Sequence, residues 1–218
     1  VKVFVEAGGL GFNVTSPFKQ KAHTLVDVLD PSAAQCGAVN TVVVRNNKLV
    51  GYNTDGAGLI LDLTKNLNLN LNTKKILLIG AGGAAKGVLP YLIQEQSKNL
   101  VVVNRTLKKA EQMISGYNNS ALSACNFEDL IDQQFDLVIN ATSSSLDQVD
   151  LPLPSTLFAD GAMSYDMVYS QTETHFMRWS LTMGVKKVSD GLGMLVEQAA
   201  LAFEIWRGVY PDTKTVLN

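Results

Sequence analysis

The chain has 218 residues, of which 46% are hydrophobic and 17% charged, a composition suited to a sizeable core and unlike that of a disordered chain. Its net charge of -2 and its pI near 5.7 argue against a nucleic-acid-binding surface. No apolar run approaches the ~20 residues that a membrane span requires. The two cysteines lack metal-ligand spacing and the two histidines cannot form a histidine-rich metal site. We therefore expect a cytoplasmic protein with reduced thiols, no metal, and one or two domains.

Near the start of the chain, a short strand over 12–15 is expected to lead into a helix. Ser16 and Pro17 fit the N-cap and the first helical position, and the helix should run to about Leu29. Lys19 then falls in the first turn, where the helix dipole disfavours a cation. From its position alone, Lys19 is equally well interpreted as a solvated lysine or as a partly buried functional one.

A β-hairpin is predicted next, after an expected loop over 30–37. The runs 41–45 and 48–52 are rich in β-branched residues and flank Asn46 and Asn47, which favour a primed turn.

Asp55 lies between this hairpin and an amphipathic helical pattern over 59–67. Because N-caps favour aspartate, capping is the preferred role of Asp55 on the sequence alone. The first 55 residues do not fit the pattern of the chain that follows, so we interpret them as part of a second domain with a cleft between the two.

The most informative stretch is 75–85, with the sequence KKILLIGAGGA. The apolar run 76–79 predicts a strand buried on both faces of a parallel sheet, and an apolar helical pattern follows the glycines. Strand, glycine turn and helix form the context that a dinucleotide-binding GxGxxA pattern requires. The N–H groups at the start of the helix would face the phosphates. The alternative is a tight turn in a protein that binds no nucleotide. In both interpretations the glycine turn comprises Gly80, Ala81, Gly82, Gly83, Ala84 and Ala85.

The next predicted strand, 99–103, ends at Asn104, Arg105 and Thr106. An NAD site would have an acidic residue near this point to hold the ribose 2′-hydroxyl. Arg105 could instead grip a 2′-phosphate by a forked, charge-assisted contact. The sequence therefore favours NADP over NAD, the alternative being the basic first turn of a solvated helix.

Further strands are predicted over 135–139, 162–167 and 185–188. Together with the two strands above, they give five strands with crossovers, as a doubly wound parallel sheet requires; a short strand over 120–124 is left open. Ligands of such sheets bind beyond the carboxyl ends of the strands. The final helix, 191–207, is expected to bury a face made of Leu192, Leu195, Val196, Ala199, Phe203 and Trp206.

Several segments together resemble the shikimate dehydrogenase family, in order and at the family's spacing over essentially the whole chain. The segments are NVTSPFK (13–19), GAVNT (37–41), NTDG (53–56), the GAGGAA turn, NRT (104–106), NATS (140–143), YDM (165–167) and DGLGMLVEQ (190–198). The resemblance implies an α/β fold in which a Rossmann-type sheet binds NADP(H) and a smaller α/β domain binds substrate. It also implies NADPH-dependent, reversible reduction of 3-dehydroshikimate to shikimate, on the route to chorismate and aromatic amino acids. The implied division is a partial substrate domain over 1–55, an NADP domain over 56–189, and a C-terminal helix over 190–218 that returns to the substrate domain.

Carried across by motif, Lys19 corresponds to the family's catalytic lysine and Asp55 to its partner, which makes catalysis the preferred role of Asp55. The resemblance assigns the binding of substrate hydroxyls to Thr15, Asn40, Tyr169 and Gln198. It assigns cofactor binding to Gly80, Ala81, Gly82, Gly83, Ala84, Asn104, Arg105, Thr106, Lys109, Met167 and Gly191, where Lys109 stands in place of a frequent arginine.

The family begins with a further segment, including a Ser-x-Ser motif for the substrate carboxylate, to which nothing here corresponds. This sequence opens on Val1 without a methionine, so we expect a fragment that binds NADP but turns over poorly. The alternatives are an NAD-dependent quinate/shikimate dehydrogenase, another NADP enzyme such as a methylene-tetrahydrofolate dehydrogenase, and a non-catalytic NADP-binding module. A homodimer is left open.

Overall fold

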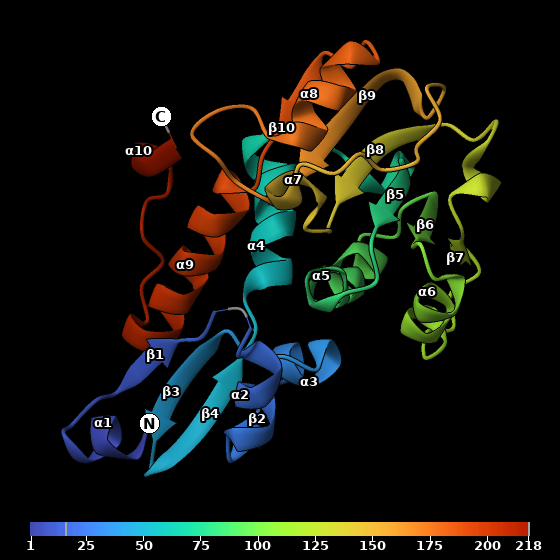
Figure 1. Cartoon of the computed structure of the whole chain (residues 1–218). Coiled ribbons are helices and arrows are strands. Elements are labelled where there is room, and N and C mark those ends of the chain that lie inside the picture. Colours follow the sequence, from blue (N-terminus) through green and yellow to red (C-terminus); the bar gives the residue numbers. More distant parts are fainter. Residues whose placement is uncertain (16, 218) are drawn as a thin grey trace.

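The structure is a computed structural model that describes residues 1–15 and 17–217, and these residues form two β-sheets (Figure 1). The smaller sheet has the strand order β1-β3-β4-β2. Its strands are β1 (Gly11–Asn13), β2 (Val28–Leu29), β3 (Thr41–Arg45) and β4 (Lys48–Tyr52). The helices beside it are α1 (Lys2–Glu6), α2 (Lys19–Leu25) and α3 (Pro31–Cys36).

The predicted hairpin is confirmed. β3 and β4 pair antiparallel from Thr41 opposite Tyr52 to Arg45 opposite Lys48. Asn46 and Asn47 both have positive φ, 50° and 58°, as a primed two-residue turn requires.

Two local predictions are wrong in this part of the chain. The helix α2 begins at Lys19 and ends at Leu25 instead of reaching Leu29, because Val28 and Leu29 pair with β4 as a strand. The expected loop over 30–37 is the helix α3, in which Asp30 is the N-cap and accepts a hydrogen bond from the Ser32 amide at 2.9 Å. The predicted N-cap Ser16 lies outside the described residues.

The larger sheet has the order β10-β9-β8-β5-β6-β7, and all its strands are parallel. The doubly wound prediction is confirmed, with a sixth strand, β7, near the segment left open. The order reverses between β5 and β8, which is where such sheets bind ligands. The strands are β5 (Lys75–Ile79), β6 (Asn99–Val103), β7 (Leu122–Cys125), β8 (Phe135–Asn140), β9 (Phe158–Asp166) and β10 (Lys187–Ser189).

Helices cover both faces of this sheet (Figure 1). Ile76 and Leu78 of β5 pack into one buried apolar cluster, and Leu77 and Ile79 pack into another on the opposite face. This explains the unbroken apolar run, because a strand buried on both sides shows no polar alternation. The flanking helices are α5 (Gly83–Gln94), α6 (Leu107–Ile114), α7 (Ser144–Asp147) and α8 (His175–Thr182), with short 3₁₀ turns at Leu71–Thr73 and Glu128–Leu130.

Two long helical segments run between the sheets. The first is α4 (Asp55–Leu61), which continues as a π-helical turn, η1 (Asp62–Asn66). The second is α9 (Leu192–Arg207), which is followed by α10 (Lys214–Leu217).

Most of the predicted buried face of α9 is wrong: Val196 and Trp206 are half-buried, but the other four residues are exposed, Ala199 among them. Leu192, Leu195 and Phe203 remain 45%, 37% and 44% exposed. The buried positions are instead Met194, Glu197, Ala200 and Ala202. The helix is oriented by close packing on α4, where a Cβ added to Gly58 would lie 2.7 Å from the backbone nitrogen of Gln198, and this orientation buries Met194 and Glu197 in place of Leu192 and Leu195.

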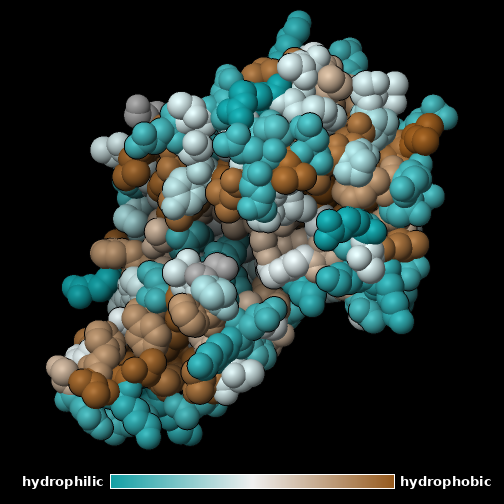
Figure 2. All heavy atoms as spheres, in the orientation of Figure 1, coloured by the Kyte–Doolittle hydropathy of each residue, from teal (hydrophilic) through white to brown (hydrophobic). Residues whose placement is uncertain are grey.

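The surface around the smaller sheet carries exposed apolar side chains. Figure 2 shows apolar patches over this part of the molecule, and Val3, Phe4, Phe18 and Leu25 are among the exposed residues there. Within the described ranges, no helix combines the length and apolar character that crossing a membrane would need.

Candidate active site

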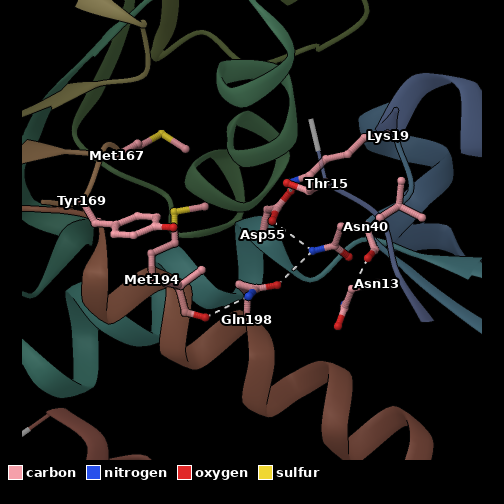
Figure 3. A pocket seen from close by; sticks show the side chains of 12 residues that line it. Asn13, Thr15, Lys19, Asn40, Asp55, Met167, Tyr169, Met194 and Gln198 are labelled. Atoms are coloured by element: carbon pink, nitrogen blue, oxygen red, sulfur yellow. Dashed lines mark hydrogen bonds and ion pairs between the residues drawn. The ribbon is translucent and has the colours of Figure 1, made fainter. Parts of the chain in front are cut away.

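A cavity of about 290 Å³ lies between the smaller sheet, α9 and the loop that follows β9 (Figure 3). It contains all six residues predicted to be catalytic or substrate-binding, and two of the predicted cofactor residues. Its lining comprises Asn13, Val14, Thr15, Lys19, Asn40, Asp55, Met167, Tyr169, Gly191, Met194, Leu195 and Gln198.

Lys19 and Asp55 form an ion pair in this cavity, with Lys19 Nζ 2.7 Å from Asp55 Oδ2. Asp55 is the first residue of α4, and Thr54 occupies the N-cap position, so the expected capping role is wrong. The carboxylate is still well placed electrostatically, because a negative charge in the first turn interacts favourably with the helix dipole. The two side chains are 32% and 16% exposed, which leaves the pair accessible to a small ligand.

Asn40 fixes the second oxygen of the same carboxylate. Its Nδ2 lies 2.9 Å from Asp55 Oδ1 and 3.3 Å from Gln198 Oε1, so one buried amide joins residues of α4 and α9. Its own orientation is set by Oδ1, which accepts a hydrogen bond from the Thr54 amide at 3.0 Å. The result is a connected row of polar groups along one wall of the cavity.

Tyr169 and Met167 reach the cavity from the opposite side, in the loop after β9 (Figure 3). Tyr169 is 56% exposed and so stands at the mouth. Gly191 lies against the same loop, because its amide donates to the Val168 carbonyl at 3.1 Å and a Cβ would overlap the backbone of Met167.

Asp166 anchors this loop. Its buried carboxylate accepts hydrogen bonds from Ser145, from Thr174 Oγ1 at 2.6 Å and from Asn140 Nδ2 at 3.2 Å. Burial raises the pKa of Asp166 above its ordinary value, although these donors oppose the rise. The anchor connects the carboxyl ends of β8 and β9 to the start of α8.

The glycine turn connects β5 to α5 at the carboxyl edge of the sheet. Gly80 has φ of 111°, and a Cβ there would lie 3.0 Å from Thr142, so this position favours glycine. A Cβ added to Gly82 or Gly83 would meet nothing within 4 Å, which leaves open space in front of the N–H groups of the first turn of α5. Free N–H groups at a helix start are the kind of donor that binds phosphate groups.

A second cavity, of about 320 Å³, links the turn to the ion pair. It is lined by Gly83 and Ala84 on one side and by Lys19 and Asp55 on the other. Lys19 and Asp55 therefore line both cavities, and the glycine turn and the polar wall open onto the same two side chains.

The predicted 2′-phosphate residues follow β6, which is hydrogen-bonded to β5 with Val103 opposite Ile79. Asn104 Nδ2 donates to the Thr106 carbonyl at 2.9 Å and shapes the loop. Arg105 and Lys109 are exposed. The loop thus lies beside the glycine turn at the same edge of the sheet, with two exposed cationic side chains.

The sequence reasoning missed Asn13 and Met194. Asn13 Nδ2 donates to the Asn40 carbonyl at 3.1 Å and to Thr41 Oγ1 at 3.2 Å, so it braces the polar wall. Its place at the head of the NVTSPFK motif was a usable signal. Met194 lines the cavity because α9 turns this side of the helix toward it. The spacing of apolar residues along the helix did not predict which side this would be.

Three models of shikimate dehydrogenase families match the chain. They are the substrate binding domain of shikimate dehydrogenase over residues 1–42, shikimate / quinate 5-dehydrogenase over 62–150, and the C-terminal domain of shikimate 5′-dehydrogenase over 191–218.

Known relatives agree with these matches. The shikimate dehydrogenase (NADP(+)) of Colwellia psychrerythraea is 46% identical over 99% of this chain and 78% of its own length. The crystal structure of an Ael1 enzyme from Pseudomonas putida superimposes with a TM-score of 0.94 at 39% identity, over 100% of this chain and 80% of that one. Shikimate 5-dehydrogenase of Thermus thermophilus, in complex with NADP(H) and shikimate, gives a TM-score of 0.83 at 34% identity over 96% of this chain and 77% of that one. The chain belongs to the shikimate dehydrogenase family.

Proposed function

We propose that this chain is an NADP-dependent shikimate dehydrogenase, which reversibly reduces 3-dehydroshikimate to shikimate in the shikimate pathway. The observation that carries the proposal is the Lys19–Asp55 ion pair, which lines both the polar cavity and the cavity that reaches the glycine turn. Family membership and the NADP-dependent relatives support the same conclusion.

When bound, NADPH supplies the hydride that adds to the carbonyl carbon of 3-dehydroshikimate. The carbonyl oxygen gains negative charge as this bond forms, and the Lys19 ammonium stabilises that charge and delivers the proton. Asp55 holds Lys19 at 2.7 Å and keeps the ammonium at the cavity wall. The neutral lysine then regains a proton from solvent, to which it is accessible.

The polar wall provides specificity for a polyol. Thr15, Asn40, Tyr169 and Gln198 line the cavity, and their hydroxyl and amide groups are of the kinds that hydrogen-bond a ring hydroxyl. For Asn40, such a contact would replace one of the bonds that its amide makes to Asp55 and Gln198. An analogue that lacks a hydroxyl would leave one of these groups unpaired, and such sites discriminate strongly against it.

The cofactor residues are proposed in three groups. The turn from Gly80 to Ala84 and the helix start behind it hold the diphosphate. Asn104, Arg105, Thr106 and Lys109 hold the 2′-phosphate. Met167 and Gly191 lie beside the cavity and line the nicotinamide side.

We also propose that the chain has three functional parts, with the boundaries expected from the sequence. Residues 1–55 bind substrate, 56–189 bind NADP, and 190–218 return to the substrate side. The position of Gln198 in the polar wall supports this last assignment.

The test is the absorbance of reduced nicotinamide after the chain is mixed with shikimate and NADP⁺. Parallel mixtures replace shikimate by quinate, or NADP⁺ by NAD⁺. We expect reduction with shikimate and NADP⁺, and a kcat/KM at least about tenfold lower in the other mixtures. NADP⁺ binding without reduction by either polyol would reject the activity and leave a nucleotide-binding module.

A further inference from the structure

A buried polar cluster lies outside the cavity, where η1, β9 and α9 meet. Asp62, Tyr165 and Glu197 are 3%, 0% and 2% exposed. The Tyr165 hydroxyl donates to Asp62 Oδ2 at 2.7 Å. Asn66 Nδ2 lies 2.9 Å from Asp62 Oδ1 and 3.0 Å from Glu197 Oε1, so it bridges the two carboxylates.

Each element of this cluster carries a residue of the cavity or leads directly into one. The helix that continues into Asp62 begins with Asp55. The strand that contains Tyr165 ends one residue before Met167. The helix that contains Glu197 carries Met194 and Gln198 into the cavity. The cluster therefore lies at the junction where α4 with η1, β9 and α9 meet, and these three segments must keep fixed relative positions for the cavity to bind a substrate.

The first turn of α9 is packed directly on Asp62. A Cβ added to Gly193 would overlap the Asp62 carboxylate, so glycine is required for this approach. Tyr165 and Met194 belong to the same buried cluster, and burial together with the Asp62 carboxylate raises the pKa of Tyr165 well above its ordinary value. The Tyr165–Asp62 hydrogen bond therefore lies against the first turn of α9, which bears Gly193 and Met194.

We propose that Tyr165 and Asp62 are positioning residues, whose hydrogen bond holds the first turn of α9 so that Met194 and Gln198 keep their places in the cavity. The structural part of this inference is independent of the reaction, and its kinetic part rests on the proposed function. Small displacements of binding groups weaken productive binding. Because Gln198 is proposed to bind a substrate hydroxyl, its displacement should raise the KM for shikimate more than it lowers kcat.

The experiment compares Tyr165→Phe, which removes one hydroxyl, with Ser164→Ala as a matched control. Ser164 is the preceding residue of β9, is fully buried, and shares a hydrogen bond of 2.7 Å with Ser180 of α8. Both variants thus lose one buried hydroxyl contact of the same strand, but only Tyr165 touches the junction. The measurements are the KM values for shikimate and NADP⁺, and hydrogen exchange of peptides covering 190–198.

We expect Tyr165→Phe to raise the KM for shikimate about tenfold, which corresponds to about 1.4 kcal/mol, and to leave the KM for NADP⁺ within about twofold. Exchange in 190–198 should accelerate by a similar factor. Ser164→Ala should change neither the KM for shikimate nor the exchange in 190–198. Both variants should melt at a lower temperature than the wild type.

Asp62→Asn is the second variant, and it serves if Tyr165→Phe does not fold. Asparagine keeps the shape and an acceptor for Tyr165 but loses the charge, so exchange in 190–198 should accelerate about threefold. If the wild type does not oxidise shikimate, the proposed function fails, while faster exchange confined to 190–198 still supports the positioning role. Wild-type exchange in both variants, or an equal effect in Ser164→Ala, would overturn it.

Discussion

Removing the ammonium of Lys19 is the sharpest perturbation of the proposed chemistry. Lys19→Ala removes the ammonium that is proposed both to stabilise the developing oxyanion and to deliver its proton. A positioned proton donor contributes roughly 10²–10⁴ in rate. We therefore expect kcat/KM to fall by that factor, equivalent to about 3–5 kcal/mol of transition-state stabilisation.

The same substitution should hardly affect folding or cofactor binding. The Lys19–Asp55 pair is partly exposed, at 32% and 16%, and such pairs contribute about 0–1 kcal/mol to stability after screening by solvent. Lys19 does not belong to the cradle proposed for the phosphates. The dissociation constant for NADP⁺ should stay within about twofold of the wild-type value.

Lys21→Ala is the matched control, because Lys21 is exposed on the same helix and lies outside the polar cavity. The assay is steady-state reduction of NADP⁺ by shikimate, with NADP⁺ binding measured by calorimetry. The reasoning is refuted if Lys19→Ala retains more than about a tenth of the wild-type kcat/KM, or if Lys21→Ala loses as much.

The remaining predictions concern the cofactor, pH and the thiols. Arg105→Ala should raise the KM for NADP⁺ by about 10- to 100-fold and leave that for NAD⁺ unchanged; equal effects on both would contradict a 2′-phosphate contact. Burial raises the pKa of Asp62, so the folded state binds a proton that the unfolded state releases, and this stabilisation is lost as pH rises. Denaturant titrations should therefore show the wild type gaining stability over Asp62→Asn as pH falls from about 7 to 4, and an opposite trend would contradict the assignment. Burial raises the pKa of Cys36 and of Cys125 to about 11, so both thiols should react with a disulfide reagent at pH 8 only on unfolding; rapid reaction of the folded protein would disprove this.

Sequence patterns predicted those parts of the fold that depend on neighbouring residues. The turn at Asn46 and Asn47 needs two residues that tolerate positive φ, and the glycine turn needs a strand before it and a helix after it. Both could be read locally, whereas the Asp30 cap of α3 carried a local signal that was overlooked.

The site required contacts that no local pattern contains. Asp55 was first interpreted as a cap because its partner Lys19 is 36 positions away in the sequence. The buried face of α9 depends on Gly58 of another helix, which lets the two helices approach closely and sets which side of α9 is buried. The family resemblance predicted that Lys19 pairs with Asp55. The structure showed in addition that the pair lines both cavities.

The most direct test of the proposed reaction follows the hydrogen that is transferred. The chain is incubated with 3-dehydroshikimate and NADPH that carries deuterium at both positions of nicotinamide C4, and the product is analysed by mass spectrometry. We predict shikimate with one deuterium, bound to the carbon that was the carbonyl carbon. Shikimate without deuterium, or no shikimate although NADPH binds, would contradict hydride transfer at this site.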